Sequence, residues 1–286
     1  MTGNAALAAG VQRLTEAGVP TPSRDARRLM AHALDIPPDR LTLVLPDLVA
    51  PAALARFEAA ISARCHRQPV AQIIGYRDFF GRRFAVTQDV LDPRPETERL
   101  VLAALASPAR RVLDLGTGTG CLLVTLLAEW PEAVGVGVDI SEPALGIAAR
   151  NAEALGVSKR AVFRRADWCA DLDGAFDLVV ANPPYVTAAE MAALDEDVRR
   201  WEPEQALCPG GDGLDAYRAI AADVRGLMAP GARLLLEIGP SQAGAVSALV
   251  RAAGLEDIEI LPDLDGRDRV VAAKAPVSGP KSRGFG

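Results

Sequence analysis

A glycine-rich segment near the middle of the chain has residue types and spacing suited to binding a ligand. In "VLDLGTGTGCLLV" an apolar strand pattern leads into Gly116, Gly118 and Gly120, and a helical pattern follows. Glycine permits a tight turn and lets the backbone approach a ligand closely. The spacing is Gly-x-Gly-x-Gly, whereas dinucleotide-binding loops use Gly-x-Gly-x-x-Gly. Asp114 precedes the loop, and an acidic residue there suits a cationic amino group better than a pyrophosphate.

Polar residues also follow the next two strand patterns. Asp139 ends "VGVGVD", and its carboxylate can accept hydrogen bonds from the hydroxyls of a ribose. In "RADWC", Asp167 and Trp168 could bind and cover an adenine. Open α/β sheets bind ligands along the edge where these residues occur, so their order predicts a site for S-adenosylmethionine. The alternative is that Asp139 merely caps the following helix and that Trp168 belongs to the core.

The segment "VVANPPYV" predicts a bend rich in hydrogen-bond acceptors at the end of a further strand. The side-chain oxygen of Asn182 and the main-chain oxygen of Pro183 can each accept one N–H of a planar amide or exocyclic amine. Such a nitrogen is a poor nucleophile because its lone pair is delocalised. Holding both N–H groups directs the lone pair at a sulfonium methyl and stabilises the developing positive charge. We therefore expect methyl transfer to nitrogen.

The rest of this segment supports the same interpretation. Proline at 183 and 184 fixes φ and removes two N–H donors, and the ring of Tyr185 can stack on the planar group and favour a developing cation. Asn-Pro is also an ordinary turn signal. We expect catalytic roles for Asn182, Pro183 and Tyr185, and substrate binding by Asn182, Pro183, Pro184 and Tyr185.

The composition argues against several classes of protein. The formal net charge is −6, so the chain as a whole lacks the basic footprint of proteins that bind nucleic acid through its phosphates. Four widely spaced cysteines and two histidines predict no metal site and suit a reducing cytoplasm. The apolar runs are too short to span a bilayer, and the N-terminus lacks the pattern of a signal peptide.

Hydrophobic patterns divide the chain into four parts. Residues 1–70 contain helical stripes, one of which starts with Thr21 as cap and Pro22 in the first turn. Residues 71–94 have the glycine-punctuated β-branched and aromatic pattern of a hairpin linker. Residues 95–275 alternate strand and helix patterns, which predicts an α/β fold with a mostly parallel sheet and helices on both faces. Residues 276–286 are expected to be a disordered tail.

These motifs make the sequence resemble the methyltransferases that modify the glutamine of the Gly-Gly-Gln loop in peptide chain release factors. The resemblance covers most of the chain and rests on the linker "PVAQIIGYRDFFGRRFAVTQDVLDPRPETERLV", "DLGTGTG", "NPPY", "WEPEQAL" and "GGDGLDAYR". "NPPY" is shared with adenine and cytosine amino-methyltransferases, so "RPETE" carries the subfamily assignment. The resemblance implies a class I S-adenosylmethionine-dependent methyltransferase (Rossmann-like) domain with a small N-terminal helical domain. One departure is Asp92, where the family pattern has an apolar residue.

The resemblance also implies roles for individual residues and parts. The glycine loop would hold the methionine and ribose parts of the cofactor, and Asn182 would touch both cofactor and substrate. Arg94, Glu96 and Glu98 stand beside the site, or simply begin a helix. The N-terminal domain would recognise the release factor, with a monomeric enzyme and no direct binding of nucleic acid or membrane expected. The implied cofactor-binding residues are Gly116, Thr117, Gly118, Thr119, Gly120, Asp139, Trp168 and Asn182.

Other functions stay open at this point. An amino-methyltransferase could act on another protein glutamine, as a similar class does on a ribosomal protein, and Asp92 leaves room for such a paralogue. A nucleic-acid base is a second candidate acceptor, although the chain has no obvious recognition domain or basic runs. A non-catalytic scaffold is the third alternative, and it would have no use for "DLGTGTG", Asp139 and "NPPY" together.

Overall fold

The computed structural model describes residues 1–277 and divides into two compact units. The first unit comprises residues 1–76 and 194–202, and the second comprises residues 77–193 and the chain from residue 203 onward. Residues 278–286, most of the predicted tail, lie outside the described residues. Within residues 1–277, no helix has both the length and the apolar character needed to cross a membrane.

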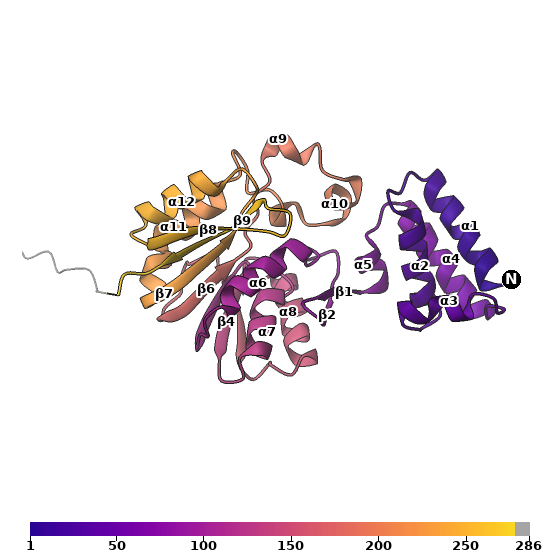
Figure 1. The fold of residues 1–286 in the computed structure, drawn as a ribbon, viewed down its shortest axis with the longest axis horizontal. Coiled ribbons are helices and arrows are strands. Elements are labelled where there is room, and N and C mark those ends of the chain that lie inside the picture. The colour runs from indigo at the N-terminus through magenta and orange to yellow at the C-terminus, as the bar shows by residue number, and fades with distance from the viewer. Residues whose placement is uncertain (278–286) are drawn as a thin grey trace, which may run out of the picture. The chain divides into compact units, whose positions relative to one another are not determined.

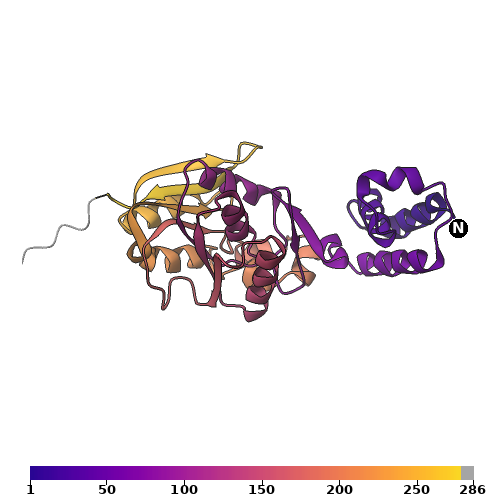
Figure 2. The ribbon, with the colours of Figure 1, turned by 90° about the horizontal axis from the view of Figure 1, so that it is seen from below.

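The first unit is helical, and its longer helices gather into one bundle (Figures 1 and 2). Leu14, Leu29, Phe57 and Ile61 are fully or almost fully buried in its core. Gly10 lets two of the helices approach closely, because a Cβ there would lie 2.7 Å from the Phe57 ring. The α-helices are α1 (Gly3–Glu16), α2 (Pro22–Ala33), α3 (Leu41–Val44), α4 (Pro51–Cys65), α5 (Val70–Ile74) and α10 (Glu196–Trp201), and the 3-10 helix is η1 (Pro38–Arg40).

The start of α2 differs from the prediction in one respect. Thr21 occupies the position before Pro22, but its hydroxyl does not cap the helix. It donates instead to Oδ1 of Asp25 at 3.0 Å. The Thr21 oxygen also accepts from Arg24 Nη2 at 3.3 Å, so the hydroxyl bonds to two side chains of α2 in place of a main-chain N–H.

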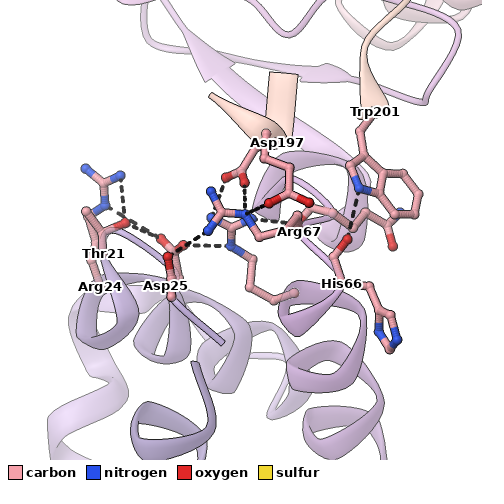
Figure 3. A network of polar contacts seen from close by, with 11 residues as sticks. Thr21, Arg24, Asp25, His66, Arg67, Asp197 and Trp201 are labelled. Carbon is pink, nitrogen blue, oxygen red and sulfur yellow. Dashed lines mark hydrogen bonds and ion pairs between the residues drawn. The ribbon is translucent and has the colours of Figure 1, made fainter. Parts of the chain in front are cut away.

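Ion pairs attach residues 194–202 to the helical unit (Figure 3). Arg64 is 4% exposed and pairs with Asp25 at 2.8 Å and with Asp197 at 2.6 Å. Arg67 also reaches Asp197, at 2.6 Å. The indole of Trp201 donates to the main-chain oxygen of residue 66 at 3.2 Å. These contacts explain why a segment so distant in sequence belongs to the first unit.

The second unit begins with a hairpin and continues as a seven-stranded sheet. In the hairpin, Phe80 and Gly81 both have positive φ, as a two-residue turn between twisted strands requires. The sheet order is β5-β4-β3-β6-β7-β9-β8. The strands are β1 (Tyr76–Phe79), β2 (Arg82–Ala85), β3 (Arg111–Leu115), β4 (Val134–Asp139), β5 (Ala161–Arg165), β6 (Phe176–Ala181), β7 (Met228–Glu237), β8 (Glu256–Pro262) and β9 (Asp268–Lys274).

Helices cover both faces of this sheet (Figure 1). One apolar core joins the sheet to α6 (Glu98–Leu105), α7 (Cys121–Glu129) and α8 (Glu142–Ala154). The other joins it to α11 (Asp215–Leu227) and α12 (Ala243–Ala252). The shorter helices of this unit are η2 (Pro95–Thr97), α9 (Ala188–Met191) and η3 (Glu204–Ala206).

The prediction of a mostly parallel sheet is confirmed. β3 pairs in parallel with both β4 and β6, and β4 pairs in parallel with β5. The last two strands differ, because β9 runs antiparallel to both β7 and β8. Leu115 is in register with Val138 on one side and with Ala181 on the other. The loops that follow these three strands therefore leave the sheet at one edge.

Candidate active site

A cavity of about 460 Å³ lies at this edge of the second unit. Its volume is within the range of pockets that hold a small organic ligand. The glycine loop after β3, the ends of β4 and β6, and the loop after β5 all contribute to its wall. Parts outside the strand ends also contribute to the wall: residues 89–94, Thr97, residues 203–209 except Glu204 and Leu207, and Asp215, Ala216 and Ala219 of α11.

The glycine loop has a backbone conformation that requires glycine. Gly116, Gly118 and Gly120 all have positive φ, between 54° and 76°. A Cβ on Gly116 would also lie 3.3 Å from the ring of Trp168. Gly116, Thr117, Gly118 and Thr119 line the cavity. Gly120 does not, and a Cβ there would meet Ala148 at 3.1 Å, so this glycine serves the packing of α7 on α8.

Asp114 supports the loop without reaching the cavity. Its side chain is fully buried, and its Oδ2 accepts hydrogen bonds from Thr117 Oγ1 at 2.6 Å and from the main-chain N–H of Leu123 at 3.3 Å. Burial raises the pKa of this carboxyl group to about 7. Asp114 does not line the cavity, so the structure gives no contact for the cationic amino group that its position suggested.

Asp139 combines a structural role with free acceptor positions at the cavity wall. Its Oδ2 accepts the N–H of Gly118 and its Oδ1 accepts the N–H of Ser141, both at 2.9 Å. The cap of α8 is Ser141, whose hydroxyl accepts from Ala144 N at 3.3 Å, so the carboxylate does not cap that helix. Each carboxylate oxygen keeps an acceptor position, which fits a pair of ribose hydroxyls.

Trp168 lines the cavity and also packs against the core. The core interpretation of this residue is therefore confirmed, and its role in covering an adenine stays a prediction. Its φ of 50° is unusual for a residue with a large side chain. Asp167 lies beside it on the cavity wall. A half-buried aromatic ring next to the glycine loop provides a flat apolar surface that fits an adenine.

The segment after β6 is divided between the cavity and the core. Asn182 and Pro184 line the cavity, whereas Pro183 is buried and Tyr185 packs half-buried against the core. Burial raises the pKa of the Tyr185 phenol. The structure therefore brings Asn182 and Pro184 to the wall, and the predicted catalytic roles of Asn182, Pro183 and Tyr185 stay predictions.

The "RPETE" segment is also divided. Arg94 and Thr97 line the cavity, and the Asn182 amide nitrogen donates to Thr97 Oγ1 at 3.2 Å. Glu98 serves the fold instead, because its carboxylate accepts the N–H of Phe80 in the hairpin turn at 2.8 Å. Asp92, the departure from the family pattern, is 5% exposed and belongs to the cavity wall.

The sequence interpretation missed two side chains that support this site. Gln242 is buried, and its Nε2 donates to the main-chain oxygens of Tyr185 at 3.0 Å and Gly213 at 3.2 Å. Glu237 ends β7 with its side chain 1% exposed. Glu237 follows three leucines in the apolar run "RLLLEIG", and a charged residue at that place was the available signal. Nothing in the local pattern marks Gln242.

Two family models match the chain. The PrmC N-terminal domain matches residues 5–75, and the methyltransferase small domain matches residues 88–211. Solved structures with the same fold include a methyltransferase from Pyrococcus furiosus, with a TM-score of 0.54, 12% identity and coverage of 75% of this chain and 97% of that one. The hMettl16 catalytic domain in complex with the MAT2A 3'UTR hairpin 6 has a TM-score of 0.55, 16% identity and coverage of 77% and 82%. The expected class I methyltransferase fold is thereby confirmed.

Curated relatives match almost the whole chain. The release factor glutamine methyltransferase of Cereibacter sphaeroides is 60% identical over 273 residues, which cover 96% of this chain and 98% of the relative. The protein of the same name from Rhodospirillum rubrum is 46% identical, with coverage of 95% and 84%. With this identity over nearly its full length, and with a methyltransferase fold that carries the glycine loop and "NPPY" at one sheet edge, the chain belongs to the release factor glutamine methyltransferase family.

Proposed function

We propose that this protein transfers a methyl group from S-adenosylmethionine to the side-chain amide nitrogen of the glutamine in the Gly-Gly-Gln loop of peptide chain release factors. The observation that carries the proposal is one cavity whose wall contains both the glycine loop with Asp139 and the amide of Asn182. The names of the curated relatives support the same acceptor.

The cofactor-binding part of the proposal rests on the fit described above. The glycine loop would hold the methionine and ribose parts, Asp139 the ribose hydroxyls, and Trp168 the adenine. Bound there, S-adenosylmethionine supplies a methyl group that is open to attack by a nucleophile. Asn182 lies on the same wall and would contact both the cofactor and the incoming glutamine.

The acceptor part of the proposal concerns the glutamine amide. Asn182 Oδ1 and the main-chain oxygen of Pro183 would each accept one N–H of that amide. The nitrogen lone pair is then directed at the methyl group, and the charge on nitrogen is stabilised as it forms. The methylated nitrogen releases its proton to water, so no general base is required. Pro184 and Tyr185 would complete the grip on the substrate.

The helical unit is proposed to recognise the release factor, in a monomeric cytoplasmic enzyme that does not bind nucleic acid directly. Deleting residues 1–70 should abolish methylation of the whole release factor, while binding of S-adenosylmethionine remains detectable by calorimetry. Full activity in the truncated enzyme would refute this role.

The substrate assignment is tested by transfer of a labelled methyl group to purified release factor. Label should appear on the wild-type factor and be absent from a variant in which the loop glutamine is replaced by alanine. Equal labelling of both factors would reject the proposed acceptor. Efficient, salt-sensitive labelling of DNA or RNA would instead favour a nucleic-acid base.

A further inference from the structure

We propose that Thr97 and Glu237 are positioning residues that determine which atom of the Asn182 amide is presented to the substrate. The proposal rests on the function proposed above, since it concerns how Asn182 Oδ1 becomes available as an acceptor. Thr97 comes from η2 and Glu237 from the end of β7, so two elements outside the "NPPY" segment would control its asparagine.

The contacts form a short chain of polar groups. Asn182 Nδ2 donates to Thr97 Oγ1 at 3.2 Å. The Thr97 side chain in turn lowers the pKa of the Glu237 carboxyl group by hydrogen bonding, which is the effect of a hydroxyl that donates to the carboxylate. Thr97 is 2% exposed and Glu237 is 1% exposed, so water does not offer either of them an easy substitute partner.

The number of protons that each group can donate determines which group is the donor in each of these contacts. An ionised carboxylate can only accept hydrogen bonds, and a threonine hydroxyl has one proton to donate. Once Thr97 gives that proton to Glu237, its oxygen can act only as an acceptor towards Asn182. Asn182 must then turn its NH₂ group to Thr97, and its Oδ1 is directed away from Thr97.

This orientation matters because the two ends of an asparagine amide have opposite hydrogen-bonding character. With Oδ1 presented, Asn182 accepts an N–H of the substrate amide and supports the lone pair on nitrogen. With the amide turned over, an NH₂ group would face the substrate NH₂ group, and both would be donors. The orientation of one amide therefore separates a competent site from an incompetent one.

The charge on Glu237 determines which group is the donor and which is the acceptor in these contacts. Burial raises the pKa of this carboxyl group to about 7, while the Thr97 hydrogen bond and Arg269 lower it. A protonated Glu237 could donate to Thr97, which would free the Thr97 proton for Asn182 Oδ1 and favour the wrong orientation. The titratable and charged groups that act on Glu237, or that its charge influences, are Arg94, Glu96, Cys121, Tyr185, Tyr217 and Arg269.

The first test compares Thr97→Val with Thr97→Ser in the full-length enzyme. Valine keeps the shape but removes the hydroxyl, so kcat for methylation of the release factor should fall on the order of 10–10²-fold, with a smaller change in the affinity for S-adenosylmethionine. Serine restores the hydroxyl and should restore most of kcat. The matched control is Thr125→Val, because Thr125 is fully buried in α7 and its Oγ1 has no hydrogen-bond partner among the described residues. It should retain wild-type kcat.

The second test is the pH profile of kcat for wild type and Glu237→Gln. Wild-type kcat should decline as the pH falls through about 7, because protonation of Glu237 releases the orientation of Asn182. Glutamine does not titrate and can both donate and accept, so the variant should be slower at pH 8 and should lack this acid limb. Thr97→Val combined with Glu237→Gln should be no slower than the worse single variant, since both act through one chain of contacts.

The outcomes separate this proposal from the function on which it rests. An active wild-type enzyme with unchanged kcat in Thr97→Val, or with the same acid limb in Glu237→Gln, overturns the positioning role and leaves the function intact. If Thr97→Val does not fold, Thr97→Ser and the Glu237→Gln profile decide the question. A wild-type enzyme that does not methylate the release factor removes the proposed function, and the positioning role falls with it.

Discussion

Gln242 Nε2 lies 3.0 Å from the main-chain oxygen of Tyr185, and the same nitrogen lies 3.2 Å from the main-chain oxygen of Gly213. One buried amide thus joins the "NPPY" segment to the "GGDGLDAYR" segment. Its other end accepts the N–H of Gly239 at 3.0 Å. Gly213 lies so close to Tyr185 that a Cβ would come within 2.5 Å of the Tyr185 oxygen. The backbone of the proposed active-site bend is therefore held by a side chain that need not touch the substrate.

Gln242→Glu should lower both the stability and kcat of the enzyme. A carboxylate cannot donate, so it would face the two main-chain oxygens as a third acceptor and lose both hydrogen bonds. We expect a decrease in the free energy of unfolding of about 1–3 kcal/mol, measured by denaturant titration. Gln88→Glu makes the same chemical change at an exposed position and should leave both quantities near wild type. Equal behaviour of the two variants would contradict the bridging role.

Asp139→Ala should weaken binding of S-adenosylmethionine on the order of 10–100-fold, as measured by calorimetry. The variant loses the acceptors for the N–H groups of Gly118 and Ser141 as well as those offered to the ribose. Asp177→Ala is a matched control, because Asp177 Oδ2 likewise accepts two main-chain N–H groups, from Arg110 and Arg111, but does not line the cavity. Unchanged affinity in Asp139→Ala would exclude Asp139 as a cofactor ligand.

Asn182→Ala should lower kcat on the order of 10²–10³-fold while the affinity for S-adenosylmethionine changes less. The reason is that alanine removes the acceptor that is proposed to act on the substrate nitrogen during methyl transfer. Steady-state kinetics with the release factor and calorimetry with the cofactor measure the two effects separately. Near-normal turnover would remove Asn182 from the mechanism.

The sequence predicts the catalytic fold well because its signals are local. The strands β3, β4 and β6 each appear as a short apolar run, and a residue that lines the cavity stands at or directly after the end of each run, as in Gly116, Asp139 and Asn182. Parallel pairing then brings the ends of neighbouring strands together without further information. For this reason the residues on the cavity wall that lie at strand ends were accessible from the sequence.

The supporting residues were not accessible, because their partners are distant in sequence. Thr97 meets Asn182 across 85 positions, and Gln242 meets Tyr185 across 57. No period or spacing encodes such pairs, since they depend on how two loops leave the sheet. The same reason applies to residues 194–202, whose membership of the helical unit depends on Asp197 meeting Arg64 across 133 positions.

Asp197→Ala should lower the free energy of unfolding by about 1.5–3 kcal/mol, because it removes a charged hydrogen bond to Arg64 and an ion pair with Arg67 and leaves buried Arg64 with one carboxylate. The side chain of Asp197 is 20% exposed, so solvent replaces part of the loss. The neighbouring Glu196 is more exposed and pairs mainly with Arg200 on the same short helix. Glu196→Ala should therefore change stability by less than about 1 kcal/mol. Thermal unfolding of the two variants side by side measures the difference, and equal melting temperatures would contradict the buried network.

Asp114→Asn should change how stability depends on pH. The folded-state pKa of Asp114 is about 7, above its ordinary value of 3.8, because burial penalises the charged form. The folded state therefore holds this proton more tightly than the unfolded state, and the resulting stabilisation is complete below pH 3.8 and is lost as the pH rises to about 7. Asparagine can accept from Thr117 and Leu123 but does not titrate. Relative to Asp114→Asn, the wild-type protein should thus lose unfolding free energy on the order of 4 kcal/mol between pH 4 and pH 8, measured by urea unfolding across that range. A constant difference between the two proteins over these pH values would show that Asp114 is ionised in the folded state throughout.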